Sequence, residues 1–163
     1  MSLANVRRML AISVATLALA LAVPVSAQDK DVFAGTWTLN LAKSKYDPGP
    51  APKTASVVFS SKGTEVAATI DAVSGTGEKQ HWSYSGAIDG KDHPMPGNNP
   101  DGDTISIRRI SATSVETTYK LKGKPTLVNV RSVSADGKTL TVTTKGTNAK
   151  GEKVNNLQVF DKK

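Results

Sequence analysis

Apolar and polar residues alternate one by one along most of the chain from residue 28 onward, which is the pattern of half-buried β-strands. The clearest example is the stretch 65–73, where Val66, Ala68, Ile70 and Ala72 occupy every second position. Thr, Val, Ser and Ile dominate such stretches, and a turn-forming Gly, Asn, Asp or Pro recurs about every 8–12 residues. No window shows the apolar period of about 3.6 residues that marks an amphipathic helix. The pattern therefore predicts an all-β fold.

We expect nine strands, joined for the most part by short turns. They span residues 35–41, 54–60, 65–73, 78–88, 104–110, 114–121, 126–134, 139–145 and 153–161. Asp136-Gly137 is the strongest hairpin signal among the turns. Strands joined by short turns pair with their neighbours. Nine strands exceed what an open twisted sheet usually holds, so closure into a single antiparallel up-and-down β-barrel is expected.

Two segments interrupt the strands. The proline-rich stretch 47–52 cannot be a central strand, so we expect an extended crossing loop. The stretch Asp89–Asp103 contains three prolines and several turn signals, and we expect an irregular loop there. Loops of this length are uncommon unless they are functional, which favours a lid or rim over the barrel. A plain surface loop is the equal alternative.

The apolar positions that share a strand phase define the expected interior. They are Trp37, Leu39, Val57, Phe59, Val66, Ile70, Trp82, Tyr84, Ile105, Ile107, Val115, Tyr119, Leu140, Val142, Leu157 and Val159. Many positions in phase with them are Ala, Thr or Ser. A barrel lined by small residues can leave space for a ligand. A lightly packed, filled core is the alternative that the sequence leaves open.

The first 27 residues have the order of a secretory signal peptide. Arg7-Arg8 is the positive start, Met9–Val23 is an uncharged and largely apolar run, and Val25-Ser26-Ala27 supplies the small residues of a cleavage site. A membrane helix is the alternative, but spanning needs about 20 apolar residues. We therefore expect a signal peptide at 1–27 and one domain at 28–163, located in the periplasm or secreted, with no membrane insertion.

Charge and cysteine content narrow the possible partners. The formal net charge is +7, and it becomes +5 without Arg7 and Arg8. The densest basic group, Lys120, Lys122 and Lys124, is expected to be a solvated strand face, and no aromatic interleaving suggests nucleic-acid binding. The chain has no cysteine, which excludes disulfides, thiol catalysis and attachment of lipid to an N-terminal cysteine. We expect a monomer without a nucleic-acid partner.

Polar residues in phase with apolar ones are the candidates for a binding site, because an inward polar group needs a partner. Arg109 shares the phase of Ile105 and Ile107, and Arg131 that of Leu127 and Val133. An inward guanidinium would bind a carboxylate or phosphate through its planar set of donors. The alternative is that a bulge turns either arginine outward or that its strand has reached the rim.

No motif for catalysis, metal or cofactor binding is present. His81 alternates opposite Trp82 and is expected to face solvent, and His93 lies in the long loop near Asp89 without a second histidine at ligand spacing. Gly137-Lys138-Thr139 lacks the glycine that a phosphate-binding loop requires five positions earlier, and no Gly-x-Ser-x-Gly occurs. The sequence thus predicts no enzyme activity, no cofactor and no metal.

The triplet Gly35-Thr36-Trp37 resembles the Gly-x-Trp signature that opens the first strand of lipocalins and fatty-acid-binding proteins. In that superfamily the tryptophan closes one end of an antiparallel barrel and packs against an arginine from a late strand. The resemblance implies that Trp37 is this tryptophan and that Arg131 is the best-placed arginine. The segments 35–45 and 136–142 also resemble a group of small exported bacterial proteins, which supports the architecture only.

These observations together predict an exported lipocalin-like barrel that binds a small hydrophobic or amphipathic molecule. Its cavity would be lined by Trp82, Tyr84 and Tyr119, with Arg109 or Arg131 as the anchor for an acidic head group. The alternative is a structural or interaction module of the cell envelope with a filled core. An enzyme that uses the same cavity is the weakest possibility.

Overall fold

The computed structural model describes residues 31–62 and 64–163, so the predicted signal peptide lies outside the described residues. The fold is all-β. Its elements are β1 (Gly35–Leu39), the short 3-10 helix η1 (Leu41–Lys43), β2 (Thr54–Lys62), β3 (Glu65–Val73), β4 (Lys79–Ala87), β5 (Asp92–Pro94), β6 (Thr104–Ser111), β7 (Ser114–Leu121), β8 (Lys124–Val133), β9 (Thr139–Thr147) and β10 (Lys153–Lys162). Within this part of the chain, no helix is long and apolar enough to cross a membrane.

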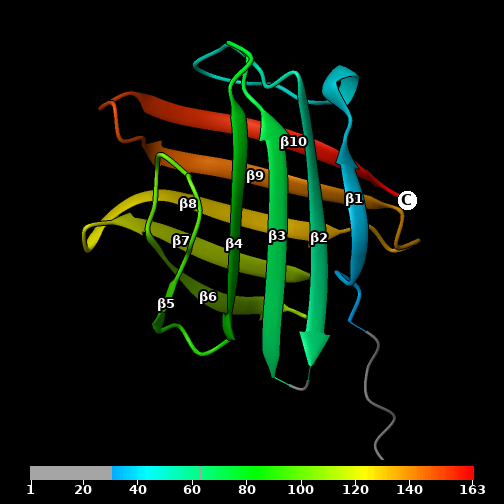
Figure 1. The fold of residues 1–163 in the computed structure, drawn as a ribbon. Coiled ribbons are helices and arrows are strands. Elements are labelled where there is room, and N and C mark those ends of the chain that lie inside the picture. Colours follow the sequence, from blue (N-terminus) through cyan, green and yellow to red (C-terminus); the bar gives the residue numbers. More distant parts are fainter. Residues whose placement is uncertain (1–30, 63) are drawn as a thin grey trace, which may run out of the picture.

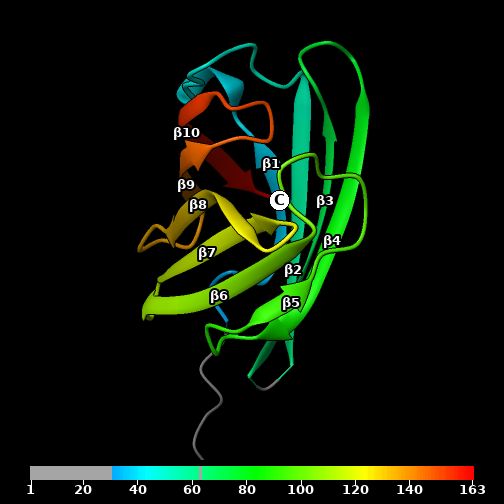
Figure 2. The ribbon, with the colours of Figure 1, turned by 90° about the vertical axis from the view of Figure 1, so that its left-hand side faces the viewer.

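The ten strands form one antiparallel sheet in the order β4-β3-β2-β1-β10-β9-β8-β7-β6-β5. Sequence neighbours pair from β1 to β4 and from β5 to β10, and β1 also pairs with β10, which joins the two halves of the chain. β4 and β5 are the two ends of the sheet. The sheet curls into two layers, with β1–β4 on one side and β6–β10 crossing them on the other (Figures 1 and 2). The prediction of an antiparallel up-and-down barrel is confirmed.

The barrel closes along a seam between β4 and the segment that contains β5. Here the expectation of nine strands is corrected to ten, because the predicted loop Asp89–Asp103 contains β5, which pairs with β6. After β5 the chain turns to β4, where the Ser83 N–H donates to the Pro96 carbonyl at 2.9 Å and the Asn98 N–H to the His81 carbonyl at 3.0 Å. The predicted loop is therefore part of the barrel wall.

Glycine at position 97 permits this close approach. Its φ is +125°, a conformation that L side chains rarely adopt. A Cβ there would lie 2.4 Å from the His81 carbonyl oxygen. Only glycine lets the chain run directly against β4, so the local sequence determines where the barrel can close.

Trp37 is part of the buried core, and its assignment to a closed end of the barrel, which the Gly-x-Trp resemblance implies, stays a prediction. Its side chain is fully buried, and its indole N–H donates to the Phe33 carbonyl at 2.7 Å. The cation over its ring is Lys162, whose Nζ lies 4.8 Å from the ring centroid. The expectation that Arg131 packs on Trp37 is therefore wrong, because the last strand, β10, places a lysine opposite the tryptophan in register.

The phase of the last strand also differs from the prediction. Leu157 was expected inside but is 36% exposed. Asn156, Gln158 and Phe160 line the interior instead. Val159 is buried, but on the other side of the strand beside η1, where its N–H donates to the Ser44 hydroxyl. The apolar side chains of Leu157 and Val159 in β10 therefore do not point into the barrel.

Candidate functional site

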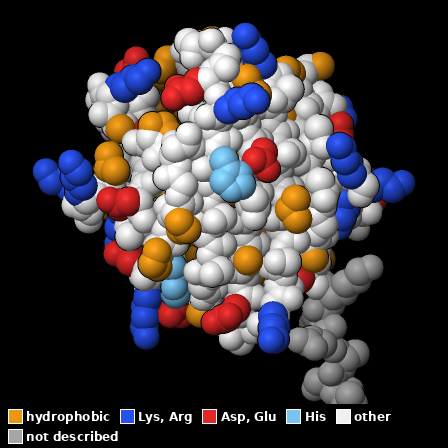
Figure 3. Space-filling view, viewed as in Figure 1, with side chains coloured by type: hydrophobic (Ala, Val, Ile, Leu, Met, Phe, Trp, Pro, Cys, Tyr) orange, Lys and Arg blue, Asp and Glu red, His pale blue; other side chains and the backbone are white. Residues whose placement is uncertain are grey.

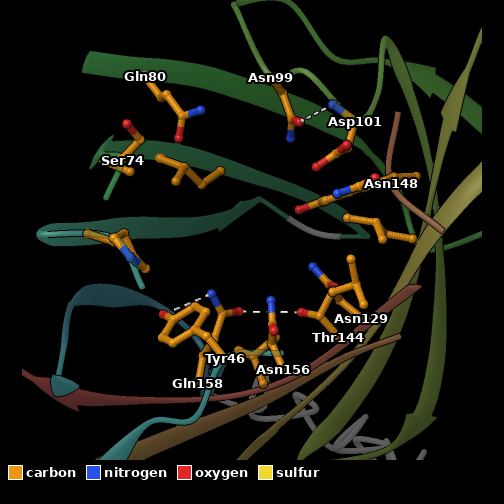
Figure 4. Close-up of a pocket in the computed structure, with 18 of the residues that line it drawn as sticks. Tyr46, Ser74, Gln80, Asn99, Asp101, Asn129, Thr144, Asn148, Asn156 and Gln158 are labelled. Carbon is orange, nitrogen blue, oxygen red and sulfur yellow. Dashed lines mark hydrogen bonds between the residues drawn. The ribbon is translucent and has the colours of Figure 1, made fainter. Parts of the chain in front are cut away.

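The interior of the barrel is hollow. A cavity of about 380 Å³ lies between the two layers and is lined by residues of β2, β3 and β4 on one side and of β7 to β10 on the other. Ligand pockets in proteins have volumes of this order. Of the two alternatives left open by the sequence, the structure shows the hollow barrel (Figure 4).

Loops at one end of the barrel border the cavity. They are the proline-rich crossing loop, the β3–β4 turn, the segment 99–101 and the β9–β10 turn. Asp101 joins two of them, because its carboxylate accepts the Ala149 N–H at 2.9 Å and its carbonyl accepts the Thr126 hydroxyl. The segment 99–101 thus forms part of the rim, while movement of this segment as a lid stays a prediction.

Arg131 lies on the cavity wall and is 8% exposed. Its Nη1 donates to the Tyr84 hydroxyl at 2.6 Å, and its guanidinium carbon lies 5.0 Å from the Phe59 ring centroid and 5.7 Å from that of Tyr84. Within residues 31–62 and 64–163, no carboxylate lies within ion-pair distance of this group. A buried cation without a counter-charge is costly, so the site is electrostatically prepared for an anion.

Three predicted aromatic residues line the same cavity, Trp82 and Tyr84 from β4 and Tyr119 from β7. Arg131 lines it together with them. The Trp82 indole N–H is buried and has no hydrogen-bond partner within the described chain. The structure therefore brings four of the five predicted site residues together and adds a free donor beside the guanidinium. Their role in ligand binding stays a prediction.

Arg109, the fifth predicted residue, is exposed and does not line the cavity. It pairs with Val115 near the end of β6, and the register between β6 and β7 shifts directly after it. The strand has reached the rim of the barrel at this point, so its side chain extends into solvent. We therefore remove Arg109 from the candidate site.

Burial, together with the neighbouring Tyr84, raises the pKa of the Tyr119 phenol to about 12, although Arg131 lowers it in part. The Trp82 indole and the Asn129 amide lie beside this hydroxyl, although neither completes a hydrogen bond to it. Tyr119 is thus a neutral hydrogen-bonding group at any ordinary pH. Among Trp82, Tyr84, Tyr119 and Arg131, the charged group is therefore the Arg131 guanidinium.

The raised pKa of Tyr119 gives a test of its burial. Above the ordinary value of 10.0 the unfolded chain releases a proton that the folded chain keeps until about pH 12. The free energy of unfolding should therefore fall with rising pH in this window, by up to about 1.4 kcal/mol per pH unit from this residue. Urea unfolding of the protein and of Tyr119→Phe measures it. Parallel pH dependence of the two proteins above pH 10 would contradict the buried phenol.

The sequence analysis missed the neutral polar residues of the cavity. Four of them, from β8, β9 and β10, form what we call the polar band: Asn129, Thr144, Asn156 and Gln158. Figure 4 shows them on one side of the cavity, with Tyr46 beside Gln158. Their positions in the strands could have revealed them, because alternate residues of a strand point to the same side. Asn129 lies two positions from Arg131, and Gln158 lies two positions from Phe160. Among the polar residues in the inward phase, only the two arginines were named as candidates for the site.

Outside the cavity, the ionisable residues form isolated pairs. His81 is exposed, as predicted, and its Nδ1 lies 2.7 Å from a carboxylate oxygen of Asp71. His93 Nε2 lies 3.1 Å from Asp89. No three His, Asp or Glu side chains gather within the part of the chain that the structure describes. The face over β2 to β4 carries scattered charges and single apolar side chains (Figure 3), so the cavity is the stronger candidate site.

Comparison with known proteins supports the fold. No protein-family model matches the sequence, and no curated protein matches it. Among solved structures, the chain is similar to the zebrafish ileal bile acid-binding protein complexed with cholic acid, with a TM-score of 0.51 and 12% sequence identity. The match covers 81% of this chain and 99% of that protein. The likeness supports the antiparallel up-and-down β-barrel fold.

Proposed function

We propose that this protein binds a small amphipathic anion inside its barrel, with Arg131 as the partner of the acidic group. The observation that carries the proposal is the buried guanidinium on the wall of a cavity of about 380 Å³, where no carboxylate of the described residues pairs with it. Phe59 and Tyr84 hold it by stacking and by one hydrogen bond, which leaves other donors of the guanidinium for a ligand.

The aromatic and aliphatic lining supports an apolar body for this ligand. Val57, Phe59 and Ile70 come from β2 and β3, and Leu140 and Val142 come from β9. Burial of hydrocarbon against such a wall contributes about 25 cal/mol per Å². The similar solved structure contains a bile acid, which is an amphipathic acid. We further propose that the protein acts as a monomer outside the cytoplasm, where the N-terminal segment would direct it.

A comparison of two ligands that differ only in charge tests the proposal. Dodecanoate and dodecan-1-ol have the same hydrocarbon chain, so calorimetric titration of the full chain separates the acidic group from the apolar body. We expect the acid to bind at least tenfold more tightly, because a hydrogen bond to a charged group contributes about 1.5–3 kcal/mol. Fluorescence offers a second readout, since Trp82 lines the cavity whereas Trp37 does not.

Absence of binding across a panel of fatty acids, retinoids and other amphipathic acids would overturn the proposal. That result would favour the alternative of an interaction module that uses its outer surface. Equal affinity for the acid and the alcohol would leave a hydrophobic binding protein but remove the role of Arg131.

A further inference from the structure

We infer that the ligand is an acid that also carries a neutral hydrogen-bonding group, a hydroxyl or an amide, along one side of its apolar body. This inference rests on the proposed function and specifies which class of amphipathic acid the cavity selects. The structural basis is the polar band, which crosses one wall of the cavity beside Arg131, while β2 and β3 on the opposite wall contribute apolar side chains.

The register of the strands shows that the band is continuous. Thr144 of β9 pairs with Asn129 of β8 on one side and with Asn156 of β10 on the other, so these three side chains form one row across the wall. Gln158 belongs to the next row, which also contains Arg131. Two residues along a strand span about 7 Å, which sets the separation between the guanidinium row and the amide row.

The hydrogen bonds within the band are incomplete. The buried Oδ1 of Asn129 has no partner within the described chain. Thr144 donates to Gln158 at 3.4 Å, and Gln158 donates to the Tyr46 hydroxyl at 3.3 Å, both near the limit for a hydrogen bond. The Trp82 N–H is a further unpaired donor in the same cavity. Buried polar groups are normally paired, so these residues point to a polar group supplied by a ligand.

The part of the opposite wall that β2 and β3 form is apolar: its inward residues are Ala55, Val57, Phe59, Ile70 and Ala72. On this side the polar groups come from β4, which contributes Gln80, Trp82 and Tyr84. A ligand with hydrocarbon all around would leave the amides of the band unpaired, which costs affinity. A ligand with a hydroxyl or amide on one side can pair with the band and still bury hydrocarbon against β2 and β3. The cavity therefore favours a ligand with its hydrogen-bonding group on one side and hydrocarbon on the other.

A positional series of hydroxyl groups tests this inference. The probes are dodecanoate and hydroxydodecanoates with the hydroxyl near the carboxylate, in the middle of the chain or at the far end, each titrated calorimetrically into the full chain. We expect one hydroxy acid to bind at least tenfold more tightly than dodecanoate, although it is the less hydrophobic molecule. The best position should lie several carbons from the carboxylate, as the spacing of the two rows requires.

Two variants locate the preference in the band, and a third serves as control. Asn129→Leu removes a buried amide that has no partner for its oxygen, so we expect the variant to fold and to bind dodecanoate at least as tightly as before. Its preference for the hydroxy acid should fall to within about twofold. Thr144→Val should reduce the preference in the same direction. Thr143→Val, the same substitution on the outer side of β9, should leave it unchanged.

The outcomes separate this inference from the proposed function. If dodecanoate binds and no hydroxy acid binds more tightly, the proposed function stands and the inference is overturned. If a hydroxy acid is preferred equally by Asn129→Leu and Thr144→Val, the band is not the cause and the inference fails as well. If no acid binds, the proposed function itself fails.

Discussion

Replacement of Arg131 by methionine should weaken the binding of dodecanoate by about 100-fold or more, while the empty protein becomes more stable. Removal of one partner of a buried charged hydrogen bond costs about 2–5 kcal/mol of binding free energy. In the empty barrel the same guanidinium is 8% exposed and lacks a carboxylate partner within the described residues. Methionine keeps the apolar contact with Phe59 and Tyr84, so we expect the free energy of unfolding to rise by about 1 kcal/mol.

Calorimetric titration and urea unfolding measure the two effects on the same sample. Arg109→Met is the matched control, because Arg109 is exposed at the rim and does not line the cavity. It removes the same charge from the chain and should change neither affinity nor stability. Unchanged affinity in Arg131→Met would show that Arg131 is a structural residue that stacks on Phe59 and Tyr84, and the proposed anchor would be lost.

Replacement of Trp37 by alanine should lower the free energy of unfolding by about 3–5 kcal/mol, a large part of the total stability of a small domain. The indole is fully buried and donates to the Phe33 carbonyl, so its loss leaves both a void and an unpaired carbonyl. Urea unfolding followed by far-UV circular dichroism measures this loss without depending on either tryptophan.

Trp82→Ala is the control for that experiment. Trp82 is only partly buried and borders a cavity that is already open, so its removal enlarges the existing space instead of creating a closed void. We expect a clearly smaller loss of stability than for Trp37→Ala, together with weaker ligand binding. An equal loss in the two variants would contradict the assignment of Trp37 to the closed end and of Trp82 to the cavity.

The strands that followed simple alternation were predictable from the sequence. The expected bounds of 65–73 and 114–121 match β3 and β7, where the residues expected to face inward recur at every second position, such as Val66, Ala68 and Ile70 in β3. β5 was missed because it has only three residues and ends in proline, so no alternation could reveal it. Its existence depends on pairing with β6, which is a tertiary effect.

The sequence predicted those residues of the candidate site that share a strand phase with apolar residues. Arg131 was assigned correctly to the interior because Leu127 and Val133 share its phase, but the same argument failed for Arg109 at the end of β6. The polar band escaped prediction for a physical reason. A cavity wall faces a ligand or solvent, so Asn156 and Gln158 point inward while Leu157 points outward. Hydrophobicity identifies the inside of a filled core but not that of a hollow one.

The seam between β4 and the β5 segment affects how a ligand reaches the interior. Elsewhere neighbouring strands are joined by a continuous ladder, whereas here a few contacts such as Ser83 to Pro96 and His81 to Asn98 hold the wall together. Opening the wall along this line breaks few backbone hydrogen bonds and leaves the strand ladders intact. We therefore expect a ligand too bulky for the rim to enter by a local opening of this seam.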